Sequence, residues 1–264
     1  MARDTETAAR LAVGARDAAA GAAQAAQGET VRVFGCLPPL CESHRPDLAV
    51  AFLEKEGEDF VRDTYRGIAE ALVRGGPVDG FIVETANTWA EVECAVAALQ
   101  EADEELAHGL PVIISMQGAL LCPETLTPQP HTAAELAQRA LQLKLGPRQL
   151  PLEAFGFNCA PPEAIIAALD AVRAAGLHEE LAEADVGLAA YANIVAADAI
   201  VGGDGGYDMG SFVHPGVRPD QEGPRYLHAC EEFIARGVTH CGGCCEVTPQ
   251  QIAALAERFS LVTQ

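Results

Sequence analysis

The sequence has 264 residues, of which 49% are apolar, with 25 glycines and 16 prolines. This composition is typical of one large α/β domain with an ample core. The formal net charge of −21 argues against a nucleic-acid partner, because phosphate binding requires clustered lysines and arginines.

Neither a membrane span nor a secretory signal is expected. The most apolar run, 186–203, is interrupted by Asn193 and Asp198, and residues 1–27 carry acidic side chains and lack a continuous apolar region. The nine cysteines therefore predict a reducing compartment, where thiols more often bind metals or take part in catalysis than form disulfides. We expect a cytoplasmic protein.

Helices and strands are predicted to alternate along the chain. The alanine-rich residues 4–27 favour a helix. Short apolar runs predict strands at 31–35, 78–84, 111–115, 154–158, 186–191 and 238–242. Helices are predicted at 56–74, 88–107, 132–144, 162–175 and 220–236, and after Thr248-Pro249, an N-cap threonine with proline at the first helical position. A segment rich in Gly and Asp, 202–217, precedes the helix at 220–236.

This alternation predicts a parallel sheet covered by helices. Polar or thiol side chains end or follow each predicted strand: Cys36, Glu84, Ser115, Cys159, Tyr191 and Cys244. Chemistry gathered on one rim favours a TIM-type (β/α) barrel over an open sheet, although periodicity alone does not separate the two. A complete eight-stranded barrel needs two more strands than the six predicted.

Two adjacent cysteines, Cys244 and Cys245, lie in a glycine-opened turn between the last strand and the last helix. A catalytic zinc usually takes three protein ligands, so a third ligand is required. Cys159 is the best candidate, because it also follows an apolar strand and precedes a helix that starts at proline. Ordinary core positions are expected for Cys41, Cys94, Cys122 and Cys230, and for Cys241 inside a strand.

Five motifs, in this order, resemble the homocysteine S-methyltransferase family. They are Gly35-Cys36-Leu37-Pro38-Pro39-Leu40 with Ser43-His44-Arg45-Pro46-Asp47, Phe81-Ile82-Val83-Glu84-Thr85 with Glu91, Phe155-Gly156-Phe157-Asn158-Cys159, Tyr191-Ala192-Asn193, and Gly242-Gly243-Cys244-Cys245 with Thr248-Pro249. The resemblance extends from about residue 5 to the C-terminus.

The resemblance implies zinc-dependent methyl transfer to homocysteine in a (β/α)₈ barrel. Cys159, Cys244 and Cys245 match the family's zinc ligands, which makes them the predicted catalytic and metal-binding residues. Glu84 matches the carboxylate that holds the homocysteine amino group. Cys36, Asn158 and Asn193 complete the predicted substrate-binding set. The expected donor is a cationic methyl compound, S-methylmethionine or S-adenosylmethionine.

The resemblance also has gaps. Relative to the family, the chain begins after the first strand, first helix and second strand, roughly 50 residues. The expected fold is therefore one barrel domain, 1–264, with about six of eight βα units. The strands at 31–35 and 238–242 would be unpaired edges, and association of two copies could cover them.

Several alternatives remain open on the sequence. Glu84 could form a structural salt bridge, and Asn158 could brace the loop. The chain could bind zinc without catalysis, or be the homocysteine module of a cobalamin-dependent methionine synthase. An iron–sulfur cluster would usually require a fourth thiolate.

Overall fold

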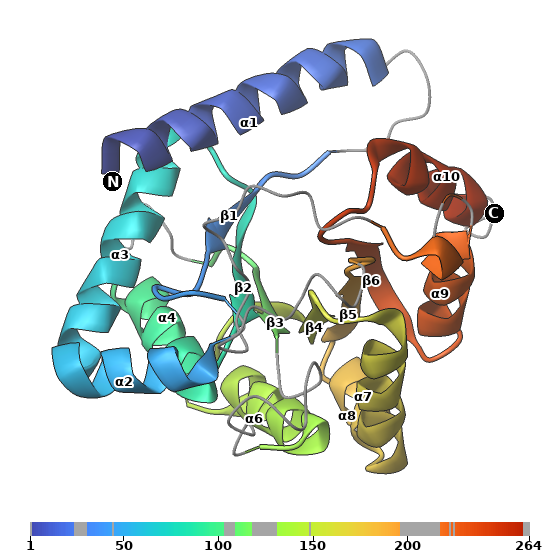
Figure 1. Ribbon diagram of the computed structural model, residues 1–264. Coiled ribbons are helices and arrows are strands. Elements are labelled where there is room, and N and C mark those ends of the chain that lie inside the picture. The colour runs from blue at the N-terminus through green and yellow to red at the C-terminus, as the bar shows by residue number, and fades with distance from the viewer. Residues whose placement is uncertain are drawn as a thin grey trace.

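The computed structural model describes residues 2–23, 31–43, 45–102, 109–117, 131–147, 149–195, 217–221, 223 and 225–260. Strands lie at its centre and helices surround them (Figure 1). The segment 202–217, except for Val217, lies outside the described residues.

Six parallel strands form one sheet in the order β1-β2-β3-β4-β5-β6. Their bounds are β1 Phe34–Leu37, β2 Gly80–Ala86, β3 Val112–Met116, β4 Leu152–Asn158, β5 Gly187–Ala192 and β6 Val238–Gly243. The predicted fold class is confirmed: this is a curved α/β sheet of the truncated TIM-barrel type. Sequential order is what right-handed crossovers between neighbouring parallel strands produce.

The helices follow from local signals in the sequence. Their bounds are α1 Ala2–Ala23, α2 Pro46–Glu56, α3 Glu58–Gly75, α4 Trp89–Glu101, α6 Ala133–Leu145, α7 Pro162–Ala174, α8 Leu177–Glu183, η2 Pro219–Gln221, α9 Arg225–Ile234 and α10 Pro249–Ser260. Thr88, Thr132 and Thr248 each accept, through the side-chain oxygen, a hydrogen bond from the backbone amide three residues on. The side chain at that third position accepts a hydrogen bond from the backbone amide of the threonine. The predicted cap at Thr248 is therefore confirmed.

Two helices were not predicted, and the strand boundaries differ most at β1. Helix α2 buries only Ala49 and so lacks a clear apolar face, and α8 is only seven residues long. Strand β1 starts three residues later than predicted and includes Cys36, which was expected in a loop. The predicted helix 220–236 is shorter, at 225–234.

The two faces of the sheet are packed differently. The outward face and the helices enclose one large core, which contains Phe81, Phe155 and Phe157. The inward face holds a small apolar group around Ile113, with Ala154 and Ala189. Charged side chains lie next to this group. Arg32, just before β1, pairs with Glu153 of β4, and His240 of β6 contacts the same carboxylate. Polar groups and thiols lie at the carboxyl ends of the strands.

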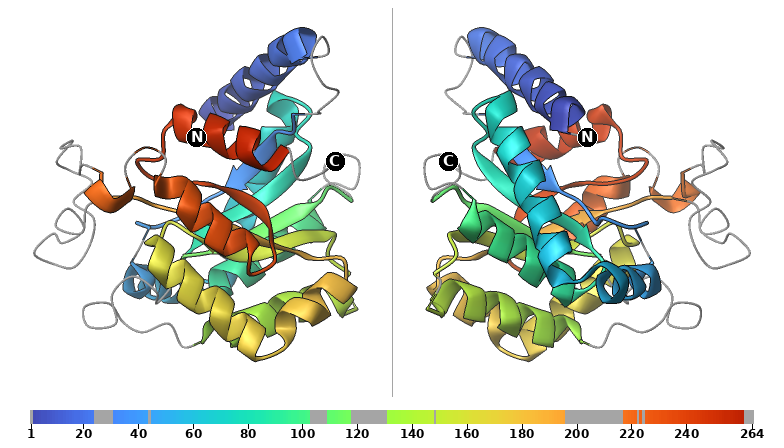
Figure 2. Two further views of the ribbon diagram at one scale, coloured as in Figure 1. Left: turned by 90° about the vertical axis from the view of Figure 1, so that its right-hand side faces the viewer. Right: turned by 90° about the vertical axis from the view of Figure 1, so that its left-hand side faces the viewer.

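Within the described residues, β1 and β6 are the two ends of the sheet, each paired on one side, as predicted. Helix α1 crosses the side of the molecule between α3 and α10 (Figures 1 and 2). It packs on α3 through Ala9 and Val13 at Gly75 and Gly76, where added side chains would clash. A second tie is Asp79, whose carboxylate accepts from Arg16 of α1 at 2.8 Å and from the Val33 amide at 2.7 Å.

Candidate metal centre

Three cysteines from two loops converge at the carboxyl end of the sheet. Cys159 follows β4, and Cys244 and Cys245 follow β6. All three sulfur atoms lie within 4.8 Å of one another. Cys159 Sγ is 3.5 Å from Cys245 Sγ, and Cys244 Sγ is 3.9 Å from Cys245 Sγ. A tetrahedral zinc with Zn–S bonds of about 2.3 Å places its sulfur ligands about 3.8 Å apart, so the donor set fits this ion.

The end of β5 holds both cysteine loops in place. The Cys159 amide donates to the Tyr191 carbonyl at 3.1 Å, and the Cys244 amide donates to the Ala192 carbonyl at 3.0 Å. The Ile194 amide then donates to the Cys245 carbonyl at 3.1 Å. Backbone hydrogen bonds thus continue from the end of β5 to the loops that follow β4 and β6. They fix the distance between these two loops.

Backbone conformation also directs the sulfurs. Cys159 has a φ of 53°, in the left-handed region that non-glycine residues rarely occupy. Such strain often marks functional positions, because the surrounding structure must maintain it. At the other loop, a side chain on Gly243 would come within 2.3 Å of Val247, so the turn carrying Cys244 requires glycine.

Without a cation, two thiols of this cluster, those of Cys159 and Cys244, keep their protons. Hydrogen bonds to Cys244 and Cys245, followed by burial, raise the pKa of Cys159 far above its usual value. The hydrogen bond from Cys159 lowers the pKa of Cys244, but Cys245 and burial outweigh it and raise that pKa to about 12. A cation at the centre would reverse this balance, because it favours thiolates.

Glu84 lies on the inward face of β2 and is half-buried. The Cys36 thiol of β1 donates to its Oε2 at 3.3 Å. Burial, then the charge of Glu84, raises the pKa of Cys36, so this thiol remains a donor. In the described part of the chain, no lysine or arginine pairs with Glu84, which argues against a structural salt bridge.

Asn158 braces the rim. Its Oδ1 accepts from Ser115 Oγ at 2.8 Å and its Nδ2 donates to Thr85 Oγ1 at 2.7 Å, so it links β2, β3 and β4. Asn193 is fully buried beyond β5, and its Nδ2 donates to the Cys159 carbonyl at 2.9 Å. The predicted site residues are therefore gathered on one rim, with Cys36 and Glu84 on β1 and β2 and the cysteine cluster at β4 and β6.

The chain is similar to known proteins in sequence and in fold. A sequence profile of the homocysteine S-methyltransferase family matches residues 2–259. The chain belongs to this family. Among solved structures, it is similar to a crystal structure of the homocysteine methyltransferase MmuM from Escherichia coli in an oxidized form, with a TM-score of 0.56 and 22% identity over 96% of this chain and 70% of that one. A comparison with curated proteins gives no match.

The family motifs did not reveal every residue that supports the site. Glu91, which resembles a family motif residue, has a structural role here: its Oε2 accepts from the amides of Asn87 and Thr88 at 2.9 Å each and caps α4. Tyr226 of α9 donates to the Gly242 carbonyl at 2.6 Å and so holds β6 just before Cys244. Its place in an amphipathic helix gives no sequence signal of that contact.

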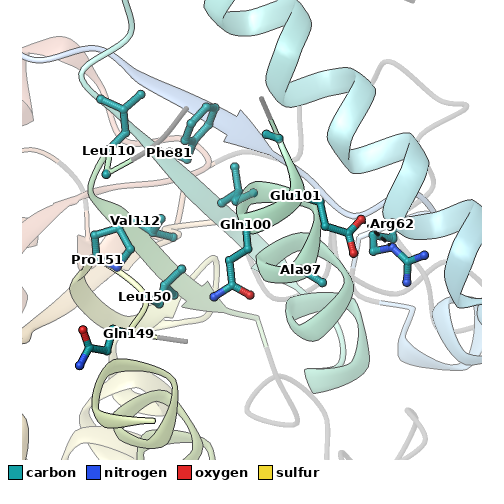
Figure 3. Close-up of a pocket in the computed structure, with 13 residues that line it drawn as sticks. Arg62, Phe81, Ala97, Gln100, Glu101, Leu110, Val112, Gln149, Leu150 and Pro151 are labelled. Carbon is teal, nitrogen blue, oxygen red and sulfur yellow. Dashed lines mark ion pairs between the residues drawn. The ribbon is translucent and has the colours of Figure 1, made fainter. Parts of the chain in front are cut away.

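One cavity of the described chain lies away from the cysteine cluster. A cavity of about 600 Å³ lies at the opposite end of the strands, beside Phe81, Val112 and Pro151 (Figure 3). Arg62 and Glu101, which pair at 3.0 Å, also line it. None of the cysteines in the cluster lines this cavity.

None of the described helices is long and apolar enough to cross a membrane.

Proposed function

We propose that this chain transfers a methyl group from a cationic donor, S-methylmethionine or S-adenosylmethionine, to homocysteine, giving methionine. The observation that carries the proposal is the cysteine cluster, whose sulfur distances fit tetrahedral zinc and whose ligand number leaves one position for a substrate sulfur. Family membership supports homocysteine as the acceptor.

Cys159, Cys244 and Cys245 are the residues we propose to hold the zinc. When bound, the ion would keep the substrate thiol deprotonated at neutral pH, whereas a free thiol has a pKa of about 8.5. Three cysteine thiolates give the site a net negative charge, which keeps the substrate sulfur electron-rich and favours approach of a cationic donor. The transfer forms one S–CH₃ bond as the donor's bond to the methyl group breaks and its electron pair leaves with the donor.

Glu84 is the group we propose for the substrate ammonium. Its Oε1 has no hydrogen bond within the described residues, while Oε2 is held by Cys36. One carboxylate oxygen is thus fixed and the other is available. Asn158 and Asn193 contribute to binding by holding the rim and the Cys159 loop.

The first experiment is zinc per chain for protein purified without chelator, with Cys245→Ser as the test variant. Cys41→Ser is the matched control, because Cys41 lies in a loop that does not contribute to the cluster. We expect about one zinc in the parent and control and loss of zinc and methyl transfer in Cys245→Ser. Full zinc or normal turnover in Cys245→Ser would contradict the proposal.

Methyl transfer then separates an enzyme from a zinc-binding relative without catalysis. Zinc-loaded protein should form methionine from homocysteine with one of the two donors. Bound zinc without turnover on either donor would favour a zinc-binding protein without catalysis.

We also propose that residues 1–264 act as one homocysteine-binding domain. The edges of β1 and β6 are the candidate contact between two copies, which sedimentation analysis tests.

A further inference from the structure

Tyr191 has an unusual environment for a tyrosine. It lies on the inward face of β5, in register with Asn158 of β4 and Gly242 of β6. Its ring packs on the small apolar group of the barrel interior. Its hydroxyl is buried and has no described partner at hydrogen-bond geometry, although the Ser115 side chain is close enough to interact with it. Buried polar groups in native proteins are nearly always paired, so this one requires an explanation.

The hydroxyl lies among the groups of the proposed site. Glu84, Cys244 and Cys36 are close enough to act on it electrostatically, while Ser115, which interacts with it, donates its own proton to Asn158. The phenol is therefore near both the carboxylate proposed for the substrate ammonium and a cysteine of the cluster proposed for the substrate sulfur. A phenol is protonated at neutral pH, since its ordinary pKa is about 10, so it can donate one hydrogen bond.

Four other side-chain donors described on this rim are already in use. Cys36 donates to Glu84, and Ser115 donates to Asn158. The Asn158 amide donates to Thr85, and the Asn193 amide donates to the backbone. An amino acid whose sulfur and ammonium are bound still has an α-carboxylate, which must receive donors when it is desolvated.

We propose that the Tyr191 hydroxyl donates a hydrogen bond to the α-carboxylate of the amino-acid thiol, and so selects thiols that carry this carboxylate. This inference rests on the proposed function. It makes Tyr191 a specificity-determining residue, and it explains the unpaired hydroxyl as a donor reserved for substrate.

The test compares two ligands on zinc-loaded parent and Tyr191→Phe protein by titration calorimetry. Homocysteine carries the carboxylate, and 3-aminopropanethiol keeps the thiol and ammonium but lacks it. A hydrogen bond to a charged group corresponds to about a 10- to 100-fold change in affinity, so we expect homocysteine to bind that much more weakly to Tyr191→Phe. Affinity for 3-aminopropanethiol should be the same in both proteins. Zinc content and urea midpoint should not fall, because the substitution removes an unpaired hydroxyl.

Each other outcome has a distinct meaning. Equal homocysteine affinity in both proteins would overturn the inference and leave the proposed function intact. Equal weakening of both ligands would show that the phenol acts on the sulfur or on the pocket, not on the carboxylate, as would loss of zinc in Tyr191→Phe. Failure of the parent to bind homocysteine would refute the proposed function, and the inference with it.

Discussion

Gly156→Ala should separate β4 from β5 and damage the cysteine cluster. Gly156 is opposite Ala189 in the parallel register. An added Cβ would lie 1.8 Å from the Ala189 carbonyl oxygen and 2.7 Å from its Cα. These are backbone atoms in the middle of a sheet, so no side-chain rotation relieves the clash. Overpacking usually costs about 1–3 kcal/mol, and this rigid contact places the expected loss near the upper end, about 3 kcal/mol.

The assay is thermal and urea unfolding, with zinc per chain measured on the same samples. A loss of about 3 kcal/mol should lower Tm by roughly 6–12 °C in a chain of this size. Gly67→Ala in α3 is the matched control, because an added Cβ there meets no atom within 4 Å. It should instead stabilise the helix by about 0.5–1 kcal/mol. Zinc should fall in Gly156→Ala, since Cys159 is three residues along. A variant with unchanged Tm and full zinc would refute this account of the strand spacing.

Three further predictions concern acidic residues. Glu84→Gln should weaken homocysteine binding by at least about 10-fold in calorimetry while zinc content stays constant, because it removes the charge that holds the ammonium; unchanged affinity would exclude Glu84 from the pocket. Glu91→Ala should cost about 1–3 kcal/mol in urea unfolding, and Glu91→Gln much less, because a Gln oxygen can still accept at the start of α4; equal losses would show that charge matters more than the cap. The Val33 amide, then Arg16, lowers the pKa of Asp79, so its stabilisation is present above about pH 4 and is lost as the pH falls through the lowered pKa; the urea midpoints of the parent and Asp79→Asn should therefore differ at pH 7 and converge as the pH falls through that lowered pKa.

Much of the strand pattern could be predicted because buried parallel strands are nearly continuous apolar runs between turn residues. All six predicted strands are present, and Cys159 and Cys244 follow strands as expected. The boundary at β1 was wrong because the strand extends through Leu37, which is buried in the core between the sheet and the helices. Short elements such as α8 depend on tertiary contacts that a local pattern does not contain.

The metal ligands could be predicted from residue type and strand-end position, but the supporting contacts could not. Asn193 resembles a family motif residue, yet its bond to the Cys159 carbonyl depends on how two loops meet beyond β5. The Tyr226 contact with Gly242 depends on helix α9 lying against β6. Such bonds join residues distant in sequence, and no spacing along the chain encodes them.

The arrangement of the rim separates metal binding from substrate binding. The cysteine loops are fixed by hydrogen bonds to the end of β5 and by Tyr226, all within β4, β5, β6 and α9. The carboxylate proposed for the substrate ammonium lies on β2 and is held by β1, at the other end of the sheet. Zinc content should therefore report on the first group, and homocysteine affinity on both. Substitutions on β1 or β2 that change zinc content as strongly as affinity would show that the two ends of the sheet are coupled.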